Sequence, residues 1–465
     1  MKLYNTLTKQ VEEFLPLSSK TVHMFVCGPT VYDYIHIGNA RTFVVFDMVA
    51  KYFQFREFEV RYIQNITDID DKIIERAREV GEEVDDYAAR FEKEFMADVH
   101  ALGINSVTQY AKATDYIPQI IEQIERLIQK GYAYEIGDGI YFDLSKFKSY
   151  GKLSGRTSLQ DDDAISRIDD NPEKRNAGDF VLWKRSKPDE PSWQSPWFPG
   201  RPGWHIEDTS ITESFYGPQY DLHGGGQDLI FPHHEAEIAQ QEAASDKVPF
   251  VKYWMHTGFV VAKNKKMSKS LGNFAVARDV LKKYPKEVIR LYLLSGHYRS
   301  PLDYGDEALH QAEMGVERIS EFMNRLKFFE KKNPAAHKYD EKISQETDDV
   351  YQAVIAAMDD DFNTPKALAA FFEFIRLGNQ YIHEGKIDFH IAKRIIQVLD
   401  IFSNIFGIVP MRDGSVPNDI MHLVHERQSA KEARNFEKAD QLRKKVEKLG
   451  YTIDDTPYGP MVKKS

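Results

Sequence analysis

The first part of the chain alternates short apolar runs with amphipathic segments. Residues 22–27 and 58–64 are apolar runs of strand length, and the segment that opens near Asn39 places apolar residues every three or four positions. A strand, a loop of small residues, a helix and a second strand form the start of a βαβ unit. The pattern therefore predicts an α/β protein with a doubly wound parallel sheet, in which ligands bind beyond the carboxyl ends of the strands.

Helical and strand patterns continue in separate blocks. Helical periodicity covers residues 70–80, 86–101 and 115–131, and strand patterns return at 220–226 and 253–261. The stretch before these later strands ends in a Pro- and Trp-rich run and does not resemble sheet core, so we expect it to be an insertion. The last third of the chain is almost entirely helical in pattern, which predicts an α-helical bundle.

The length of 465 residues exceeds what one compact core usually contains. The blocks predict a sheet domain at 1–305, with an insertion at about 115–202 and a loop region at about 262–305, a helical bundle at 306–410, and a C-terminal region at 411–465.

Composition narrows the class of protein. The chain is 42% hydrophobic and 29% charged, which is ordinary for a globular enzyme. No apolar run approaches the roughly 18 residues of a membrane span, and the N-terminus has no apolar signal segment. A single cysteine, Cys27, excludes an internal disulfide framework. We therefore expect a cytoplasmic protein without a membrane partner.

The charge distribution says more than the net charge of −11. Residues 423–465 contain ten Lys/Arg against seven Asp/Glu, a net of +3, so the remainder carries −14. A weakly basic C-terminal region on an acidic body is compatible with contact to RNA phosphates. A solvated helical face explains the charge equally well.

Two short motifs carry the clearest chemistry. His36-Ile37-Gly38-Asn39 lies in a loop before a predicted helix, and Lys266-Met267-Ser268-Lys269-Ser270 follows about 230 residues later. Alone, the first could be an ordinary histidine and the second a solvated basic loop. Together they resemble the HIGH and KMSKS signatures of the class I aminoacyl-tRNA synthetases, with Asn39 where the last histidine usually stands. The resemblance implies a Rossmann-type catalytic domain.

The same resemblance implies how ATP is bound. Adenylate formation needs positive charge that stabilises the phosphates in the transition state, and the lysines of the second motif can supply this positive charge. No nucleophilic side chain is needed, because a substrate carboxylate and a ribose hydroxyl are the nucleophiles. We expect Mg²⁺ to accompany ATP. The implied catalytic residues are His36, Asn39, Lys266 and Lys269; the implied ATP contacts are these four with Gly38, Ser268 and Ser270.

A second group of residues has the chemistry of a metal site. His233 and Glu237 are four positions apart, so a helix beginning after Pro232 places both on one face. Imidazole and carboxylate suit Zn²⁺. Cys27 ends the first predicted strand, where the same cleft is expected to open. Alone, the acidic residues could simply complement the dipole of a first helical turn.

Six longer segments closely resemble the bacterial cysteinyl-tRNA synthetases, and the resemblance runs nearly end to end. The segments are residues 27–33, 65–71, 200–207, 224–229, 231–235 and 358–365. In that family an active-site zinc is held by two Cys, one His and one Glu, and the substrate thiolate joins as a further ligand. The resemblance thus implies Cys27, His233 and Glu237 as ligands, and a helical bundle followed by a small anticodon-binding region.

The chain departs from the family at the fourth ligand. Asp208 stands where the family has its second cysteine. Aspartate can bind zinc and preserves the charge of a thiolate, so we expect Asp208 to be a ligand. The alternative is that Asp208 only lines the cleft, with zinc bound by three residues or absent. A zinc–thiolate bond would select cysteine over serine, which shape alone separates poorly.

The remaining substrate contacts follow from the resemblance. Asp228, after the glycine run 224–226, is expected to bind the substrate amine, with Thr67, Trp204 and His223 as further contacts. Trp204 could instead be a packed aromatic side chain. Thr67 could instead cap the following helix.

The C-terminal region has the features of a tRNA-reading end. Phe436 could stack on an unpaired base, and Asp455 matches a family anticodon contact. The resemblance implies ligation of L-cysteine to cysteine tRNA by a monomer that needs no other protein. Two alternatives remain open: a ligase that joins cysteine to a small amine, and a non-catalytic relative that binds tRNA or cysteine.

Overall fold

The computed structural model describes residues 1–156, 171–262, 265–266, 275–332, 341–409, 418–456 and 459–464. Of the predicted site residues, Ser268, Lys269 and Ser270 lie outside the described residues, and Lys266 is described by its backbone alone. Among the described helices, none is long and apolar enough to cross a membrane.

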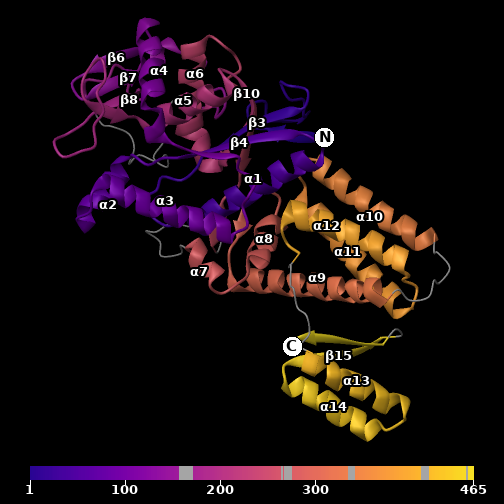
Figure 1. Ribbon diagram of the computed structural model, residues 1–465. Coiled ribbons are helices and arrows are strands. Elements are labelled where there is room, and N and C mark those ends of the chain that lie inside the picture. The colour runs from indigo at the N-terminus through magenta and orange to yellow at the C-terminus, as the bar shows by residue number, and fades with distance from the viewer. Residues whose placement is uncertain are drawn as a thin grey trace. The chain divides into compact units, whose positions relative to one another are not determined.

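The chain divides into two compact units (Figure 1). The first unit comprises Met1–Ile289, Gly296–Gly305 and Asp359–Asn363, and the second comprises Arg290–Ser295, Asp306–Met358 and Thr364–Ser465.

A five-stranded sheet, parallel throughout, lies at the centre of the first unit. Its strands are β3 (Thr21–Val26), β4 (Glu59–Ile66), β5 (Gln109–Lys112), β10 (Tyr220–Gly226) and β11 (Val251–Thr257), in the spatial order β11-β10-β3-β4-β5. This is the doubly wound order, and the direction of winding reverses between β3 and β10. The predicted α/β class is confirmed, and a ligand crevice is expected at the carboxyl ends of these two strands.

Helices cover both faces of this sheet. Helix α1 (Ile37–Phe55) lies on one face, where the ring of Phe46 reaches the position that a side chain at Gly224 would occupy. Because successive strand residues point to opposite faces, the neighbouring His223 points to the other face. There α5 (Trp204–Tyr216) and α6 (Glu235–Ser245) add Ile211 and Ile238 to the apolar cluster around Trp254.

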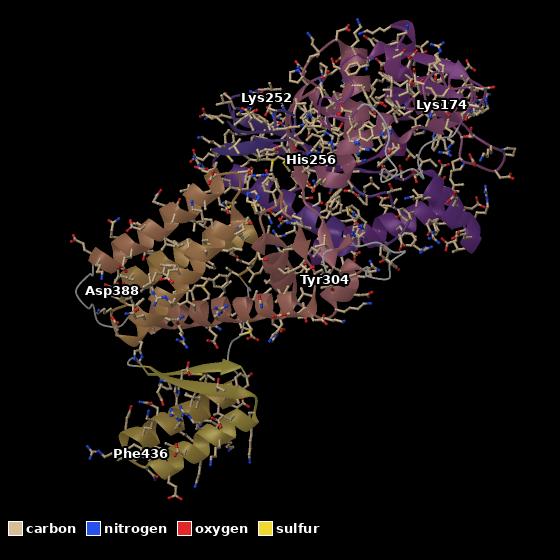
Figure 2. The ribbon with its side chains drawn as sticks, turned by 180° about the vertical axis from the view of Figure 1, so that it is seen from behind. Lys174, Lys252, His256, Tyr304, Asp388 and Phe436 are labelled. Atoms are coloured by element: carbon tan, nitrogen blue, oxygen red, sulfur yellow. The ribbon has the colours of Figure 1, made fainter. Side chains whose placement is uncertain are left out.

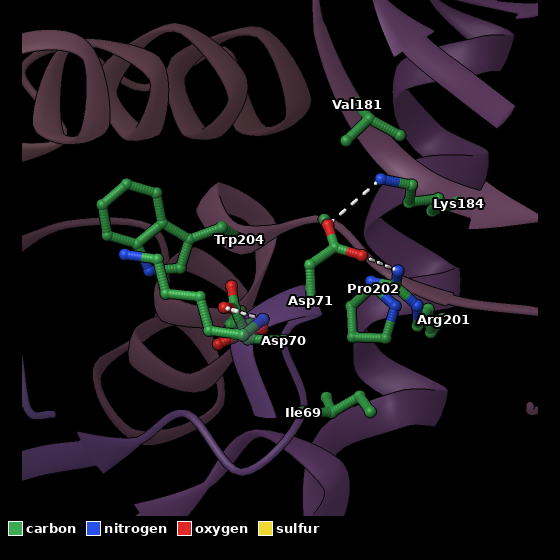
Figure 3. A pocket seen from close by; sticks show the side chains of 11 residues that line it. Ile69, Asp70, Asp71, Val181, Lys184, Arg201, Pro202 and Trp204 are labelled. Carbon is green, nitrogen blue, oxygen red and sulfur yellow. Dashed lines mark hydrogen bonds and ion pairs between the residues drawn. The ribbon is translucent and has the colours of Figure 1, made fainter. Parts of the chain in front are cut away.

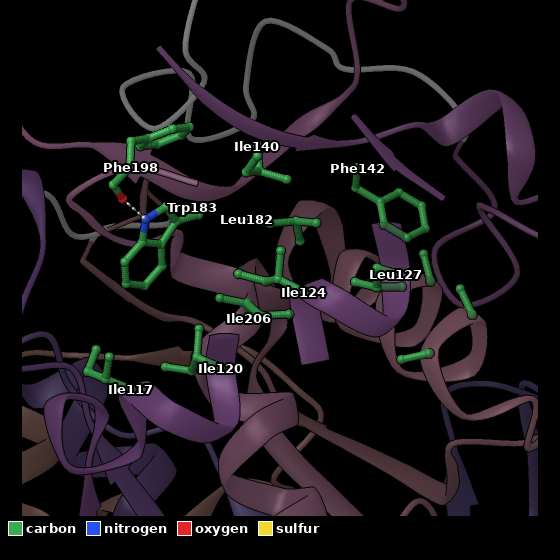
Figure 4. Packing of buried hydrophobic residues seen from close by; sticks show 13 residues of the cluster. Ile117, Ile120, Ile124, Leu127, Ile140, Phe142, Leu182, Trp183, Phe198 and Ile206 are labelled. Atoms are coloured by element: carbon green, nitrogen blue, oxygen red, sulfur yellow. Dashed lines mark hydrogen bonds between the residues drawn. The ribbon is translucent and has the colours of Figure 1, made fainter. Parts of the chain in front are cut away.

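The predicted insertion contains a second sheet, which the sequence pattern did not reveal. Strands β6 (Ala133–Ile136), β7 (Gly139–Phe142), β8 (Phe180–Arg185) and β9 (Gly200–Pro202) pair antiparallel. Residues of this sheet pack on α4 (Ile117–Gln129), whose isoleucines and Leu127 recur at helical spacing (Figure 4). Within the cluster, the indole N–H of Trp183 donates a hydrogen bond to the Phe198 carbonyl.

The first unit contains several further short elements outside its two larger sheets. The expected strand at 253–261 is wrong as one element, because β11 ends at Thr257 and β12 belongs to a small separate sheet. The remaining elements, apart from short helical turns, are β1 (Lys2–Asn5), β2 (Gln10–Glu13), α2 (Asp71–Val80), α3 (Val84–Ala101), β12 (Val260–Ala262), β13 (Lys265–Lys266), α7 (Ala277–Leu281), α8 (Lys286–Ser295), which continues into the second unit, and β14 (Leu302–Asp303).

The second unit is mainly helical, as the pattern predicts. Its core includes the stacked rings of Phe371 and Phe402, whose centroids are 3.8 Å apart. A smaller cluster holds Val424, Val446 and Ile453 near the C-terminus. The elements are α9 (Asp306–Lys332), α10 (Glu341–Asp359), α11 (Thr364–His383), α12 (Phe389–Phe406), α13 (Asn418–Glu432), α14 (Phe436–Lys448), β15 (Tyr451–Thr456) and β16 (Gly459–Lys464).

One short segment returns from this region of the sequence to the first unit. Within Asp359–Asn363, the buried carboxylate of Asp361 accepts hydrogen bonds from the Tyr4 amide at 2.7 Å, the Tyr298 hydroxyl at 2.7 Å and the Arg299 Nε at 2.8 Å. Asp361 and Phe362 both have positive φ, 58° and 49°, which costs conformational energy that these contacts must offset.

We predict that Asp361→Asn lowers the free energy of unfolding of the first unit by about 2–4 kcal/mol, because it removes the buried partner of Arg299. Asparagine tolerates positive φ, so the change isolates the charge. All five tryptophans lie between residues 183 and 254, so denaturant unfolding followed by tryptophan fluorescence reports on this unit. Glu59→Gln, in an exposed pair with Arg61, is the control and should change stability by less than about 1 kcal/mol. Equal effects of both variants would contradict the prediction.

Candidate metal centre and nucleotide site

Four buried side chains converge beyond the carboxyl ends of β3 and β10. Cys27 follows β3, Asp208 lies in α5, His233 precedes α6 and Glu237 lies in its first turn. One donor atom from each lies within 4.8 Å of the others. Nε2 of His233 is 2.9 Å from Glu237 Oε1 and 3.0 Å from Asp208 Oδ2, and the Cys27 thiol donates to Asp208 Oδ2 at 3.5 Å.

The local structure around His233 differs slightly from the expectation. Helix α6 begins at Glu235, and His233 lies in the preceding turn, Ile230–His234. The spacing of four residues still brings His233 onto Glu237, as the sequence predicts. Trp204, at the start of α5, stacks on the His233 ring with centroids 4.1 Å apart and fixes its plane.

Burial dominates the electrostatics of this cluster. It raises the pKa of the Cys27 thiol well above its usual range, and the neighbouring carboxylates raise it further. Burial also raises the pKa of Asp208 to about 7, although hydrogen bonds from Cys27 and Asn65 lower it. It raises the pKa of Glu237 to about 7, opposed by the charge of His233. Two carboxyl groups and a thiol are therefore held where their anionic forms are costly without a cation.

A metal ion fits this donor set. Neither carboxylate oxygen of the buried Glu237 accepts a well-directed hydrogen bond from any described residue. A thiol, an imidazole nitrogen and two carboxylate oxygens converge on one point, and a divalent cation would compensate their charge. The four residues predicted as ligands are thus brought together, and a metal cofactor is consistent with their chemistry.

A second set of potential ligands overlaps the first. Nε2 of His223 and Nε2 of His234 lie 3.3 Å and 3.1 Å from Cys27 Sγ, and with Cys27 and Glu237 they form another group of four. Burial lowers the pKa of both histidines well below the usual range, so both are neutral. His223, the predicted substrate contact, faces Cys27, and its Nδ1 lies 2.6 Å from the Tyr220 hydroxyl. Its substrate role stays a prediction.

A hydrogen-bond network behind Asp208 was not anticipated from the sequence. The Asn65 amide nitrogen donates to Asp208 Oδ1 at 2.6 Å, and the Thr67 hydroxyl donates to Glu207 Oε2 at 2.9 Å. Thr67 does not cap a helix, because Asp70 caps α2. Asn65 and Thr67 are two positions apart at the end of β4, so period-two reading of the strand could have placed both beside Cys27 on one face.

Trp204 and Glu207 also line a pocket beside the candidate metal site of Asp208 and His233 (Figure 3). Asp71 lies between Lys184 and Arg201 at its opposite wall and pairs with both. Asp228, the predicted amine contact, is exposed and is not among the residues lining this pocket. Its substrate role stays a prediction.

The first nucleotide motif forms the start of α1. His36 is the N-cap residue: its Nδ1 accepts hydrogen bonds from the Gly38 and Asn39 amides, and the Asn39 side chain accepts from the His36 amide. Asn39 in place of the family histidine thus completes a capping box. A Cβ at Gly38 would lie 2.7 Å from the His36 ring, so only glycine fits.

Residues that follow the second nucleotide motif contact the first motif, although the two are far apart in sequence. The amide of Ile37 donates to the Ala275 carbonyl at 2.9 Å, and Ala277 donates to the Ile35 carbonyl at 3.0 Å. The residues just after the second motif therefore lie against the first. The motif's own residues 267–270 lie outside the part of the chain that the structure describes.

The predicted tRNA residues differ in their surroundings. The Phe436 side chain is 62% exposed at the start of α14 (Figure 2). Asp455 accepts hydrogen bonds from the two terminal guanidinium nitrogens of Arg427 at 2.8 and 2.7 Å, and Lys431 and Arg443 add further positive charge. These cations hold the pKa of Asp455 below its usual range, led by the hydrogen bond from Arg427. Any tRNA contact by Asp455 would have to share its carboxylate with them.

Comparisons with known proteins agree with this arrangement. Residues 13–314 match the family model of the class I (C) tRNA synthetase catalytic domain, and residues 353–410 match the DALR domain. A crystal structure of Mycobacterium tuberculosis methionyl-tRNA synthetase bound by methionyl-adenylate has a TM-score of 0.67, with 83% of this chain and 92% of that chain covered. At 16% identity, this likeness shows the fold alone.

Relatives are similar over the full length. The chain is 44% identical to the cysteine–tRNA ligase of Carboxydothermus hydrogenoformans and 45% identical to that of Clostridioides difficile, with 99% of both chains covered in each case. With the class I catalytic domain matched over residues 13–314, this similarity shows that the chain belongs to the cysteine–tRNA ligase family.

Proposed function

We propose that this protein activates L-cysteine with ATP, giving cysteinyl adenylate and pyrophosphate. It then transfers the cysteinyl group to the 3′ end of cysteine tRNA. The observation that carries the proposal is the buried cluster of Cys27, Asp208, His233 and Glu237 at the switch point of the sheet. The family membership supports both the amino acid and the reaction.

The metal at this cluster is zinc in our proposal. Sulfur, nitrogen and oxygen donors from four side chains suit Zn²⁺, and an aspartate oxygen binds at about 2.0–2.2 Å where a cysteine sulfur would bind at about 2.3 Å. When bound, zinc supplies a soft acceptor for the thiolate of cysteine that the hydroxyl of serine does not match. The stacked Trp204 and the buried protein groups orient the ligands and exclude water.

Nucleotide binding is assigned to the start of α1 and to the second motif. His36 would contact phosphate through Nε2, because its Nδ1 serves the helix cap. Gly38 and Asn39 lie in the first turn of α1, where the helix dipole favours anions, although their own amides donate to the His36 ring. Lys266, Ser268, Lys269 and Ser270 would supply the charge and hydrogen bonds for ATP with Mg²⁺.

Substrate and tRNA contacts complete the proposal. Thr67, Trp204, His223 and Asp228 would hold the amino acid. The basic α13–α14 region, with Phe436 and Asp455, would contact the tRNA. We propose further that the protein acts as a monomer in the cytoplasm, with no obligate protein partner.

We predict cysteine-dependent exchange of pyrophosphate into ATP without tRNA, and none with serine at the same concentration, because adenylate formation needs only ATP and a bound amino acid. Radiolabelled pyrophosphate measures the exchange directly. A protein that supports no exchange with cysteine would be a non-catalytic relative. Exchange without charging of cysteine tRNA would instead point to a ligase acting on a small amine.

We predict that the purified protein holds one zinc ion per chain and that Asp208→Ala weakens zinc binding by more than the roughly 10- to 100-fold that loss of an outer-shell partner costs. Elemental analysis and competition with a chromophoric chelator measure both quantities. Asp208→Cys restores the family's donor and should keep the zinc. Asp143→Asn changes a similarly buried carboxylate in the insertion and should have no effect. Full activity without zinc would sink the assignment.

We predict that Phe436→Ala raises the KM for cysteine tRNA by about 5- to 150-fold, the cost of one lost base–aromatic stack. Pyrophosphate exchange should stay unchanged, because Phe436 belongs to the second unit and the His36–Asn39 motif to the first. Val248→Ala removes another exposed apolar side chain, 68% exposed, and is the matched control. Unchanged charging kinetics would remove Phe436 from the tRNA interface.

A further inference from the structure

Asn65 links three parts of the site that come from separate elements. It lies in β4, is 2% exposed, and contacts the backbone after Cys27, the carboxylate of Asp208 and the hydroxyl of Thr67. Neither the donor set of the metal nor the proposed substrate contacts include it. Its amide is nevertheless the described donor closest to Asp208, at 2.6 Å.

The orientation of this amide is fixed by its surroundings. The Gly28 amide points at Oδ1 of Asn65 and donates to it at 2.5 Å, so this end of the side chain has to be the acceptor. The close approach of the two chain segments depends on glycine, because a Cβ at Gly28 would lie 1.7 Å from the backbone carbonyl oxygen of Asn65. Nδ2 therefore faces Asp208, and a flipped amide would set two acceptors against each other.

This donor selects one oxygen of Asp208. Nδ2 occupies Oδ1, which leaves Oδ2 as the atom nearest to His233 at 3.0 Å and to Cys27 at 3.5 Å. A cysteine at this position offers a single sulfur and needs no such selection. An aspartate has two equivalent oxygens and a rotatable carboxylate, so a fixed donor is needed to present one of them.

We infer that Asn65 is a positioning residue for the metal in this chain: its amide holds Asp208 so that Oδ2 alone serves as the ligand. The same amide reaches Thr67 Oγ1 at 3.4 Å, which ties the ligand to the proposed amino-acid contact. The inference rests on the proposal that Asp208 binds the metal. It explains how a carboxylate replaces a thiolate without a change in the other three ligands.

The test is a double-mutant cycle on the full-length protein with zinc affinity as the readout. Asn65→Ala should weaken zinc binding by about 10- to 100-fold in the natural chain, the usual cost of losing a group that orients a ligand. In the Asp208→Cys background the same change should alter the affinity by no more than about twofold, because there is no carboxylate to orient. Chelator competition measures all four proteins.

Cobalt substitution gives a second readout that does not depend on activity. In Asn65→Ala the Co²⁺ d–d bands should change as the carboxylate changes its coordination, while the sulfur-to-cobalt charge-transfer band persists because Cys27 remains. Asn176→Ala removes another amide that donates to carboxylates, those of Asp143 and Asp179, and should change neither spectrum nor affinity.

The outcomes separate the inference from the function it rests on. If Asp208→Ala leaves zinc affinity unchanged, Asp208 is not a ligand and both ideas fail. If Asp208→Ala weakens binding and Asn65→Ala does not, the positioning role alone is overturned. An equal loss from Asn65→Ala in both backgrounds overturns it too, because the effect would then run through the Gly28 backbone. If Asn65→Ala does not fold, the nearly isosteric Asn65→Leu is measured in its place.

Discussion

The site depends on the cost of burying ionisable groups in a place that water does not reach. Cys27, Asp208 and Glu237 are at most 5% exposed, and each carries a negative charge when it acts as a ligand. Isolated in a protein interior, such charges would protonate or force the structure open. A divalent cation would remove the penalty, so a bound metal would support the closed packing of α5, α6 and the sheet.

The cost of burying polar groups also explains the hydrogen-bonded side chains that surround Cys27, Asp208 and Glu237. His223 and His234 are anchored at their other ring nitrogens, by Tyr220 and by His256 respectively. The side-chain amide of Asn65 accepts a hydrogen bond from the Gly28 amide and donates one to the Asp208 carboxylate. Buried polar networks stabilise a unique arrangement only when their members are paired. The switch point between β3 and β10 provides the room for these partners, because the chain continues from the two strands to helices on opposite faces of the sheet.

Much of the fold and of the candidate metal site could be predicted from the sequence. The features that could not be predicted depend on contacts between residues distant in the chain or on very short strands. The apolar runs at β3 and β4 and the spacing of His233 and Glu237 depend on local periodicity, which is visible along the chain. The antiparallel sheet of the insertion was missed because its strands are short and β9 has only three residues. Asn65 was missed because its role arises from Gly28 and Asp208, which are distant in sequence. The sequence alone does not explain Asn39, because its side chain accepts from the His36 backbone amide only once the helix has formed.

The pairing of one thiol with one carboxylate has a consequence for oxidation. A zinc site built with two cysteines holds two thiols side by side, and loss of the ion leaves them able to form a disulfide. Cys27 is the only cysteine in the sequence, and its neighbour in the cluster is Asp208. The emptied site therefore cannot close into an internal disulfide. Oxidation of Cys27 would begin at the sulfenic acid, which thiols reverse.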